Sequence, residues 1–290
     1  MPTVAIIGAG ELGGAVARAL ASRDCVSRIL LIDAAGGVAA GKALDIQQSG
    51  AIDGFHTRLS GTDDVSAVTG AAVCVIADRA GAGQGEVSGE WNGDEGFSLL
   101  GRVWQYATNA PIVCAGVTQT DLMPRAVREL GIPRERLVGS APDALASAIR
   151  AIVALEAQCS PSEVVVAVLG TPPRGFVVPW SEASIGGYAL DRVLSQAQLA
   201  VLEARTARLW PPGPGTLGAA AARVTEAIVG SSRRSFNAFA VLDGEFGVRN
   251  TVGAMPLFLS PTGIASLRAP ALNARERVRL QTALEGSLGG

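Results

Sequence analysis

The chain has 290 residues, of which 48% are hydrophobic and 17% charged, and its formal net charge is -2. That length allows a large core and, as a prior, two domains. The charge balance lacks the basic footprint that a nucleic acid or an anionic membrane selects, and no apolar run reaches the about 18 to 20 residues that span a bilayer. We therefore expect a cytoplasmic protein with neither a nucleic-acid nor a membrane partner; no basic leader precedes the first strand.

The first predicted element is a strand over Thr3–Gly8, a β-branched run without charge that is typical of a strand buried on both faces. Gly8, Gly10 and Gly13 follow in GxGxxG spacing and lead into a predicted helix over 11–22. The first glycine permits a tight turn, the second lets the backbone approach a pyrophosphate, and the third lets the helix pack on the strand. The helix N-terminus offers backbone N–H groups to an anion.

A second apolar run, residues 29–32, ends in Asp33, twenty residues after Gly13. A carboxylate there can accept hydrogen bonds from an adenosine ribose, and Ala34 and Ala35 offer no arginine to a 2′-phosphate, so NAD is expected rather than NADP. A glycine-rich turn alone is weak evidence, but strand, turn, helix, strand and acid stand in the required order. The alternative is a sheet that kept the turn and lost the ligand. The expected cofactor-binding residues are Gly8, Gly10, Glu11, Leu12, Gly13 and Asp33.

Helices and strands alternate up to about residue 141. The further elements predicted here are helix 41–48, strand 58–60, strand 72–77, helix 97–106, strand 111–115, helix 122–130 and strand 136–139. Six such strands predict an α/β fold with a doubly wound parallel sheet covered on both faces. The segment Asp78–Gly96 contains six glycines and, apart from Trp91, little apolar anchor. We expect it to be a mobile, functional loop.

The second half changes character. Its predicted elements are helix 143–157, strand 164–169, loop 170–175, helices 194–208 and 218–229, strands 236–242 and 255–259, and helix 274–284. This order indicates an α+β domain. The cysteines are scattered without CxxC spacing, so we expect reduced thiols, no disulfides and no metal site. They are Cys25, Cys74, Cys114 and Cys159.

The order of motifs resembles the malate and lactate dehydrogenase family along nearly the whole chain. The resemblance is carried by VAIIGAGELGG, LLID, GKALDIQQSGAIDGF, RLVGSAPD, VVVAVLG followed by VVPWSEASIGG, GEFGV and ALNARE. GKALDIQQSG followed by DGF is closest to the malate dehydrogenase branch. The resemblance implies a NAD-binding Rossmann domain over 1–141 and a C-terminal substrate-type α+β domain over 142–290. It also implies a homodimer or homotetramer, joined partly through the helices after the glycine turn and after GKALDI.

The family passes a hydride between nicotinamide and C2 of a 2-hydroxy acid. A histidine exchanges the hydroxyl proton, an aspartate orients that histidine, and two arginines hold the substrate carboxylate and polarise the carbonyl. Laid on the family pattern, the histidine position falls on Pro172, the aspartate on Leu145 and the carboxylate-binding arginine on Ala148. None of these can replace the group that is missing. We therefore expect impaired 2-hydroxy acid oxidation and leave the catalytic residues unassigned.

Five other polar residues are candidates to replace the missing groups. His56, the only histidine, lies near the third strand, where we expect a surface or structural role. Arg79 is the only arginine of the long loop, and we expect it to be a surface charge. Arg150 lies about 200° round the helix from the family's arginine position and favours a solvated or interdomain charge. Arg174 is the cation nearest to the family's histidine position at Pro172, and we expect it to be a surface charge rather than an anion-binding residue. Tyr188 is the remaining acid by elimination.

Two functions therefore stay open. One is a NAD-binding pseudoenzyme that senses the cofactor or supports a partner. The alternative is an active NAD-dependent oxidoreductase, malate dehydrogenase-like and acting on a CH–OH donor, that uses a different substrate or proton donor.

Overall fold

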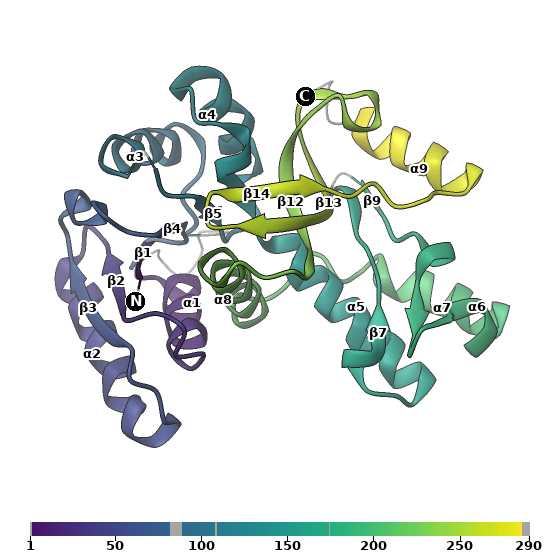
Figure 1. Cartoon of the computed structure of the whole chain (residues 1–290), viewed down its shortest axis with the longest axis horizontal. Coiled ribbons are helices and arrows are strands. Elements are labelled where there is room, and N and C mark those ends of the chain that lie inside the picture. The colour runs from purple at the N-terminus through teal and green to yellow at the C-terminus, as the bar shows by residue number, and fades with distance from the viewer. Residues whose placement is uncertain (1, 82–88, 108, 174, 286–290) are drawn as a thin grey trace.

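Six parallel strands form one half of the central sheet, in the order β3-β2-β1-β4-β5-β6 (Figure 1). The computed structural model describes residues 2–81, 89–107, 109–173 and 175–285. Val4 of β1 pairs with Ile29 on one side and Val73 on the other. Apart from the edge strand β3, these strands are apolar and buried because helices cover both faces of the sheet, so the predicted doubly wound sheet is confirmed. Their bounds are β1 Thr3–Ile7, β2 Arg28–Ile32, β3 Arg58–Thr62, β4 Val73–Ile76, β5 Ile112–Cys114 and β6 Leu137–Gly139.

The helices of this half are α1 (Glu11–Ala21), α2 (Gly36–Asp53), α3 (Gly93–Tyr106) and α4 (Leu122–Leu130). The prediction of a helix over 41–48 was too short, because glycines have low helix propensity and hid the first turn of α2. Close packing of α2 on β3 stabilises this first part of the helix. A Cβ on Gly61 of β3 would lie 2.3 Å from the Ala39 carbonyl carbon, so the two backbones are in direct contact. The helix predicted from residue 97 begins earlier, at Gly93, where acidic residues in its first turn complement the helix dipole.

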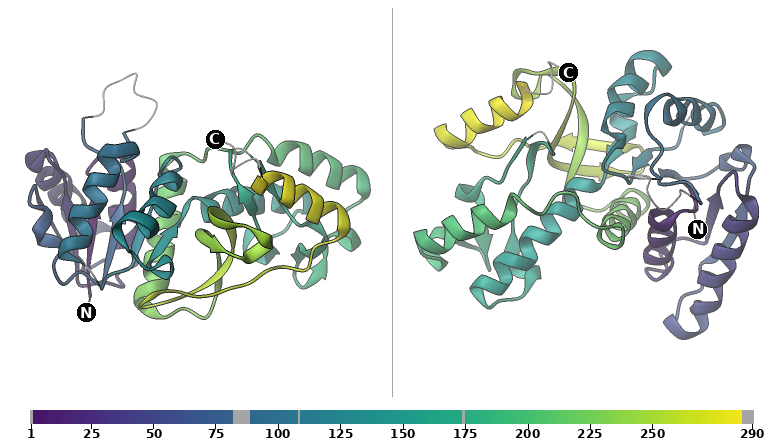
Figure 2. Two further views of the ribbon diagram at one scale, coloured as in Figure 1. Left: turned by 90° about the horizontal axis from the view of Figure 1, so that it is seen from above. Right: turned by 180° about the vertical axis from the view of Figure 1, so that it is seen from behind.

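Antiparallel strands extend the same sheet beyond β6. Phe239 of β12 pairs with Gly139 of β6, and the long β12–β13 hairpin then leads to β8 and β9. Their bounds are β8 Leu169–Thr171, β9 Gly175–Val177, β12 Ser235–Asp243 and β13 Arg249–Ser260, with β14 Gly263–Leu267 paired to β13. Figure 2 shows the purple-to-blue N-terminal half and the green-to-yellow C-terminal half at opposite ends of the long axis.

The prediction of one strand over 164–169 was wrong. The segment divides into β7 (Val164–Val165), which joins a small sheet with β10 (Ser184–Ile185) and β11 (Tyr188–Ala189), and β8 of the main sheet. Between them the backbone N–H of Val168 donates to the Asn237 side chain at 2.9 Å. A side chain therefore replaces the strand ladder there, and hydrophobic periodicity does not reveal such a break.

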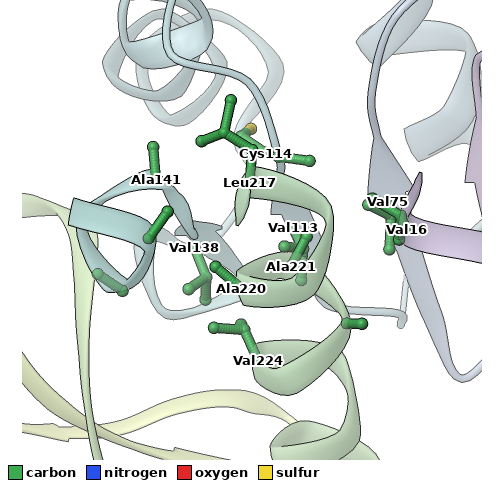
Figure 3. Close-up of a cluster of buried hydrophobic side chains, with 14 of the residues drawn as sticks. Val16, Val75, Val113, Cys114, Val138, Ala141, Leu217, Ala220, Ala221 and Val224 are labelled. Atoms are coloured by element: carbon green, nitrogen blue, oxygen red, sulfur yellow. The ribbon is translucent and has the colours of Figure 1, made fainter. Parts of the chain in front are cut away.

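Helix α8 (Pro214–Gly230) joins the two halves. A Cβ on Gly218 would come within 2.6 Å of the Ala15 Cβ of α1, so the two helix backbones touch. Figure 3 shows Leu217 and Ala221 of α8 in a buried apolar cluster with Val113 of β5. The other helices are α5 Ala141–Ala157, α6 Leu190–Val193, α7 Gln196–Thr206 and α9 Ala274–Glu285. Among the helices of the described residues, none is long and apolar enough to cross a membrane.

Candidate functional site

The glycine turn between β1 and α1 is packed against the end of β4. Gly8 has a φ of +112°, and a Cβ there would lie 2.2 Å from the Asp78 carbonyl oxygen. A Cβ on Gly13 would lie 2.0 Å from the Gly8 carbonyl oxygen. Glycine is therefore required at both positions, by backbone conformation at the first and by close approach at both.

The N-terminus of α1 is capped by a side chain from another strand. The backbone N–H of Gly13 donates to Asp78 Oδ1 at 2.7 Å, and that of Leu12 donates to Oδ2 at 3.0 Å. Asp78 lies two residues after the end of β4 and is only 9% exposed. It thus satisfies two of the N–H groups that an α-helix leaves without an intrahelical acceptor. The sequence predicts only that this residue lies in the loop Asp78–Gly96; the signal that points to its role is an acid just after the strand beside β1.

Asp33 is buried and bonded to backbone on both oxygens. Its Oδ2 accepts the N–H groups of Ala9 and Ala80, each at 2.8 Å, and its Oδ1 accepts the N–H of Ala35 at 2.9 Å. A carboxylate offers about four lone-pair positions, so one remains for a ribose hydroxyl. Asp33 therefore links the glycine turn to the segment after β4 through hydrogen bonds to Ala9 and Ala80.

Lys42, the only lysine of the sequence, lies on α2 and reaches the same turn. Its Nζ donates to the Gly10 carbonyl oxygen at 2.5 Å. A positive charge thus lies beside the turn that the sequence predicts as the pyrophosphate site.

A cavity of about 590 Å³ lies where the predicted catalytic histidine position falls. Pro172 lines it and has no proton to exchange. Asp121, at the start of α4, is the only ionisable side chain among the described residues of its wall. The others are uncharged: Val117, Thr118, Thr120, Pro124, Thr171, Pro172, Pro173, Phe239, Asn250, Thr251 and Val252. The wall therefore offers hydroxyl and amide groups but no cation within the described part of the chain.

The other positions of the family's catalytic set lie on α5. Leu145 is fully buried in the apolar core, and Ala148 is a small, half-buried residue. Arg150 lies 3.9 Å from Asp143, which also pairs with Arg223 at 3.3 Å. Burial raises the pKa of Asp143 against the lowering effect of the two arginines, and burial lowers the pKa of Arg150. Arg150 is thus engaged in an ion pair within the fold.

The remaining candidates do not meet at the cavity wall. His56 is 92% exposed, with Nδ1 3.1 Å from Asp24, and Tyr188 is 69% exposed on β11. Arg79 pairs with Glu95 at 2.8 Å. Arg174 lies outside the described residues, and so does the middle of the expected mobile loop, residues 82–88.

Comparison with known proteins shows which proteins the chain is similar to. Residues 3–89 match the family described as lactate/malate dehydrogenase, NAD binding domain. Malate dehydrogenase of Thioalkalivibrio sulfidiphilus is 28% identical over 303 residues, which cover 99% of this chain and 97% of that protein. Over nearly its whole length the chain is similar to malate dehydrogenases. The expected family, its Rossmann-type fold and NAD as the cofactor of its N-terminal domain are confirmed.

Solved structures of malate dehydrogenases have the same fold over nearly the whole chain. Malate dehydrogenase from Salinibacter ruber superposes with a TM-score of 0.84 at 26% identity, covering 97% of this chain and 93% of that one. The malate dehydrogenase from Aeropyrum pernix has the same fold, with a TM-score of 0.86 at 22% identity, covering 98% and 96%.

The dehydrogenase fold places a dinucleotide pyrophosphate at the N-terminus of α1. The ribose side of this site fits, since Asp33 keeps an acceptor position. The phosphate side does not fit in this conformation: a Cβ on Gly10 would lie 2.4 Å from the Asp78 carboxyl carbon. The space that the glycine leaves is filled by a carboxylate of this chain.

Proposed function

We propose that this chain is a NAD-binding member of the malate/lactate dehydrogenase family that does not oxidise malate or lactate at an appreciable rate. The supporting observation is the cavity beside Pro172, whose described wall carries one carboxylate and no cation. The family reaction needs a proton-exchanging group of pKa near neutrality and a cation for the substrate carboxylate. A 2-hydroxy acid would meet neither on that wall.

In this proposal residues 1–141 bind the cofactor and residues 142–290 form a substrate-type domain that has lost its reaction. The chain then acts in the cytoplasm as a pseudoenzyme, sensing cofactor or supporting a partner. A homodimer or homotetramer is supported by apolar side chains exposed along α2, namely Val38, Leu44 and Ile52. The proposed cofactor-binding residues are Gly8, Gly10, Glu11, Leu12, Gly13 and Asp33.

The second candidate is an active NAD-dependent oxidoreductase with another substrate or proton donor. It is favoured by the cavity itself, which keeps a volume of about 590 Å³ and is lined by several hydroxyl groups. Such a wall suits an uncharged carbonyl compound better than a carboxylate.

The discriminating experiment combines binding with turnover. NADH and NADPH are titrated by fluorescence, and NADH absorbance is then followed with a panel of 2-oxo acids and uncharged carbonyl compounds. The proposal expects NADH binding, weaker NADPH binding and no turnover. Turnover near ordinary enzyme rates, about 1 to 10³ per second, supports the second candidate.

A further inference from the structure

The carboxylate of Asp78 takes both of the hydrogen bonds through which the start of α1 would hold a phosphate. The two donors are the N–H groups of Leu12 and Gly13, at 3.0 and 2.7 Å. We propose that Asp78 is an internal substitute for a cofactor phosphate, so that a dinucleotide binds to this chain only after displacing it. This inference rests on the proposed cofactor site at α1 and specifies how that site is regulated.

Geometry excludes joint occupancy of the turn. All three carboxyl atoms of Asp78 lie within 2.6 Å of a Cβ built on Gly10, at 2.4, 2.4 and 2.6 Å. A phosphate that approached Gly10 as the glycine spacing implies would overlap them. Its charge would also repel the carboxylate at close range, in a site whose burial limits screening by water.

The backbone of Asp78 is held in place from two sides. The N–H of Gly10 donates to its carbonyl oxygen at 3.0 Å, and Gly8 packs directly against the same peptide. On the other side Asp78 forms an antiparallel bridge with Glu90. The carboxylate can therefore leave α1 only by rotation of its own side chain, which gives up both hydrogen bonds. Bound cofactor must supply the replacement for them.

The same arrangement leaves the adenosine end of the site unaffected. Asp33 is held by other N–H groups, those of Ala9, Ala35 and Ala80. Asp78 therefore competes with the diphosphate of a dinucleotide and not with its nucleoside. Removal of the carboxylate should change the binding of ADP and leave the binding of adenosine unchanged.

The test compares the full chain with Asp78→Ala and Asp78→Asn. The matched control is Asp53→Ala, which removes an exposed carboxylate from the far end of α2 in the same half. The probes are adenosine, ADP, NADH and inorganic pyrophosphate. Binding of each probe is measured by calorimetry and by the shift in Tm that it causes. Asp78→Asn keeps the side-chain volume and one acceptor oxygen, so it preserves the test if Asp78→Ala does not fold.

Removal of the carboxylate is expected to tighten ADP and NADH binding by about tenfold or more, because two N–H donors become available to the phosphate. Pyrophosphate should raise the Tm of the Asp78 variants more than that of the native chain or of Asp53→Ala. Adenosine affinity should stay unchanged. Equal or weaker ADP and NADH binding by both Asp78 variants overturns the inference. The proposed function fails by a different result, turnover of a 2-oxo acid by the native chain.

Discussion

The substitution Pro172→His places an imidazole on the wall of the cavity between β8 and β13, where the family resemblance puts the catalytic histidine. Enzyme turnover has a median of about 10 per second, and loss of a positioned acid-base group removes about 10² to 10⁴ of it. The native chain should therefore turn over oxaloacetate or pyruvate no faster than about 10⁻¹ to 10⁻³ per second. The question is how much of this loss the imidazole alone restores.

The surroundings of Pro172 indicate that little is restored. Leu145 is fully buried and apolar, so it cannot accept the N–H that orients the ring. The carboxylate of Asp121 would oppose a substrate anion by only about 1 kcal/mol at 4 Å in water, which makes it a minor effect. Misplacement of the ring by an ångström costs about a hundredfold. Orientation and carboxylate anchoring therefore dominate, and Pro172→His should stay within about tenfold of the native rate.

The assay follows NADH absorbance with oxaloacetate and with pyruvate. Pro173→His, at the exposed neighbouring position of the same wall, is the comparison variant, because it adds an imidazole to the cavity one residue away from the family's histidine position. The triple variant Leu145→Asp, Ala148→Arg and Pro172→His is the smallest set that restores all three family groups on these elements. Its Leu145→Asp change costs about 3 to 5 kcal/mol of stability, so urea unfolding is measured alongside. Native turnover above about 1 per second, or a rise of about a hundredfold in Pro172→His alone, would refute this reasoning.

Three further predictions concern the frame around the site. Asp33→Ala should lower the free energy of unfolding in urea by about 3 kcal/mol or more, because three backbone N–H groups lose a charged acceptor; an effect no larger than that of Asp53→Ala would contradict this. Burial raises the pKa of Cys74 and of Cys114 to about 12, so iodoacetamide at about pH 8 should modify neither thiol in the native chain and both after unfolding, as read by mass spectrometry. Hydrogen bonds from the His56 backbone and then its ring lower the pKa of Asp24 from 3.8 to about 2, so its stabilising effect is complete above about pH 4 and is lost as pH falls toward about 2. The Tm advantage over Asp24→Asn should disappear across that window, and a constant difference would count against the pairing.

Much of the N-terminal half could be predicted from the sequence. Strands buried on both faces must be apolar throughout, so β1, β2 and β4 are visible as uninterrupted runs. The glycines at Gly8 and Gly13 are equally visible, because no other residue tolerates such close backbone approach. The absence of a proton-exchanging side chain at Pro172 is likewise a property of residue identity and needs no coordinates.

The partners of the charged residues were decided only by the tertiary structure. Asp78 belonged to a loop by its neighbours in sequence, yet it caps a helix that begins 67 residues earlier, at Glu11. Arg150 pairs with Asp143 rather than standing as a solvated charge, and Val168 bonds the side chain of Asn237 instead of continuing a strand. Apolar periodicity reports only whether a side chain faces the core. The acceptor that a buried N–H or charge finds depends on which strand ends the parallel sheet brings together, and that is a property of the assembled fold.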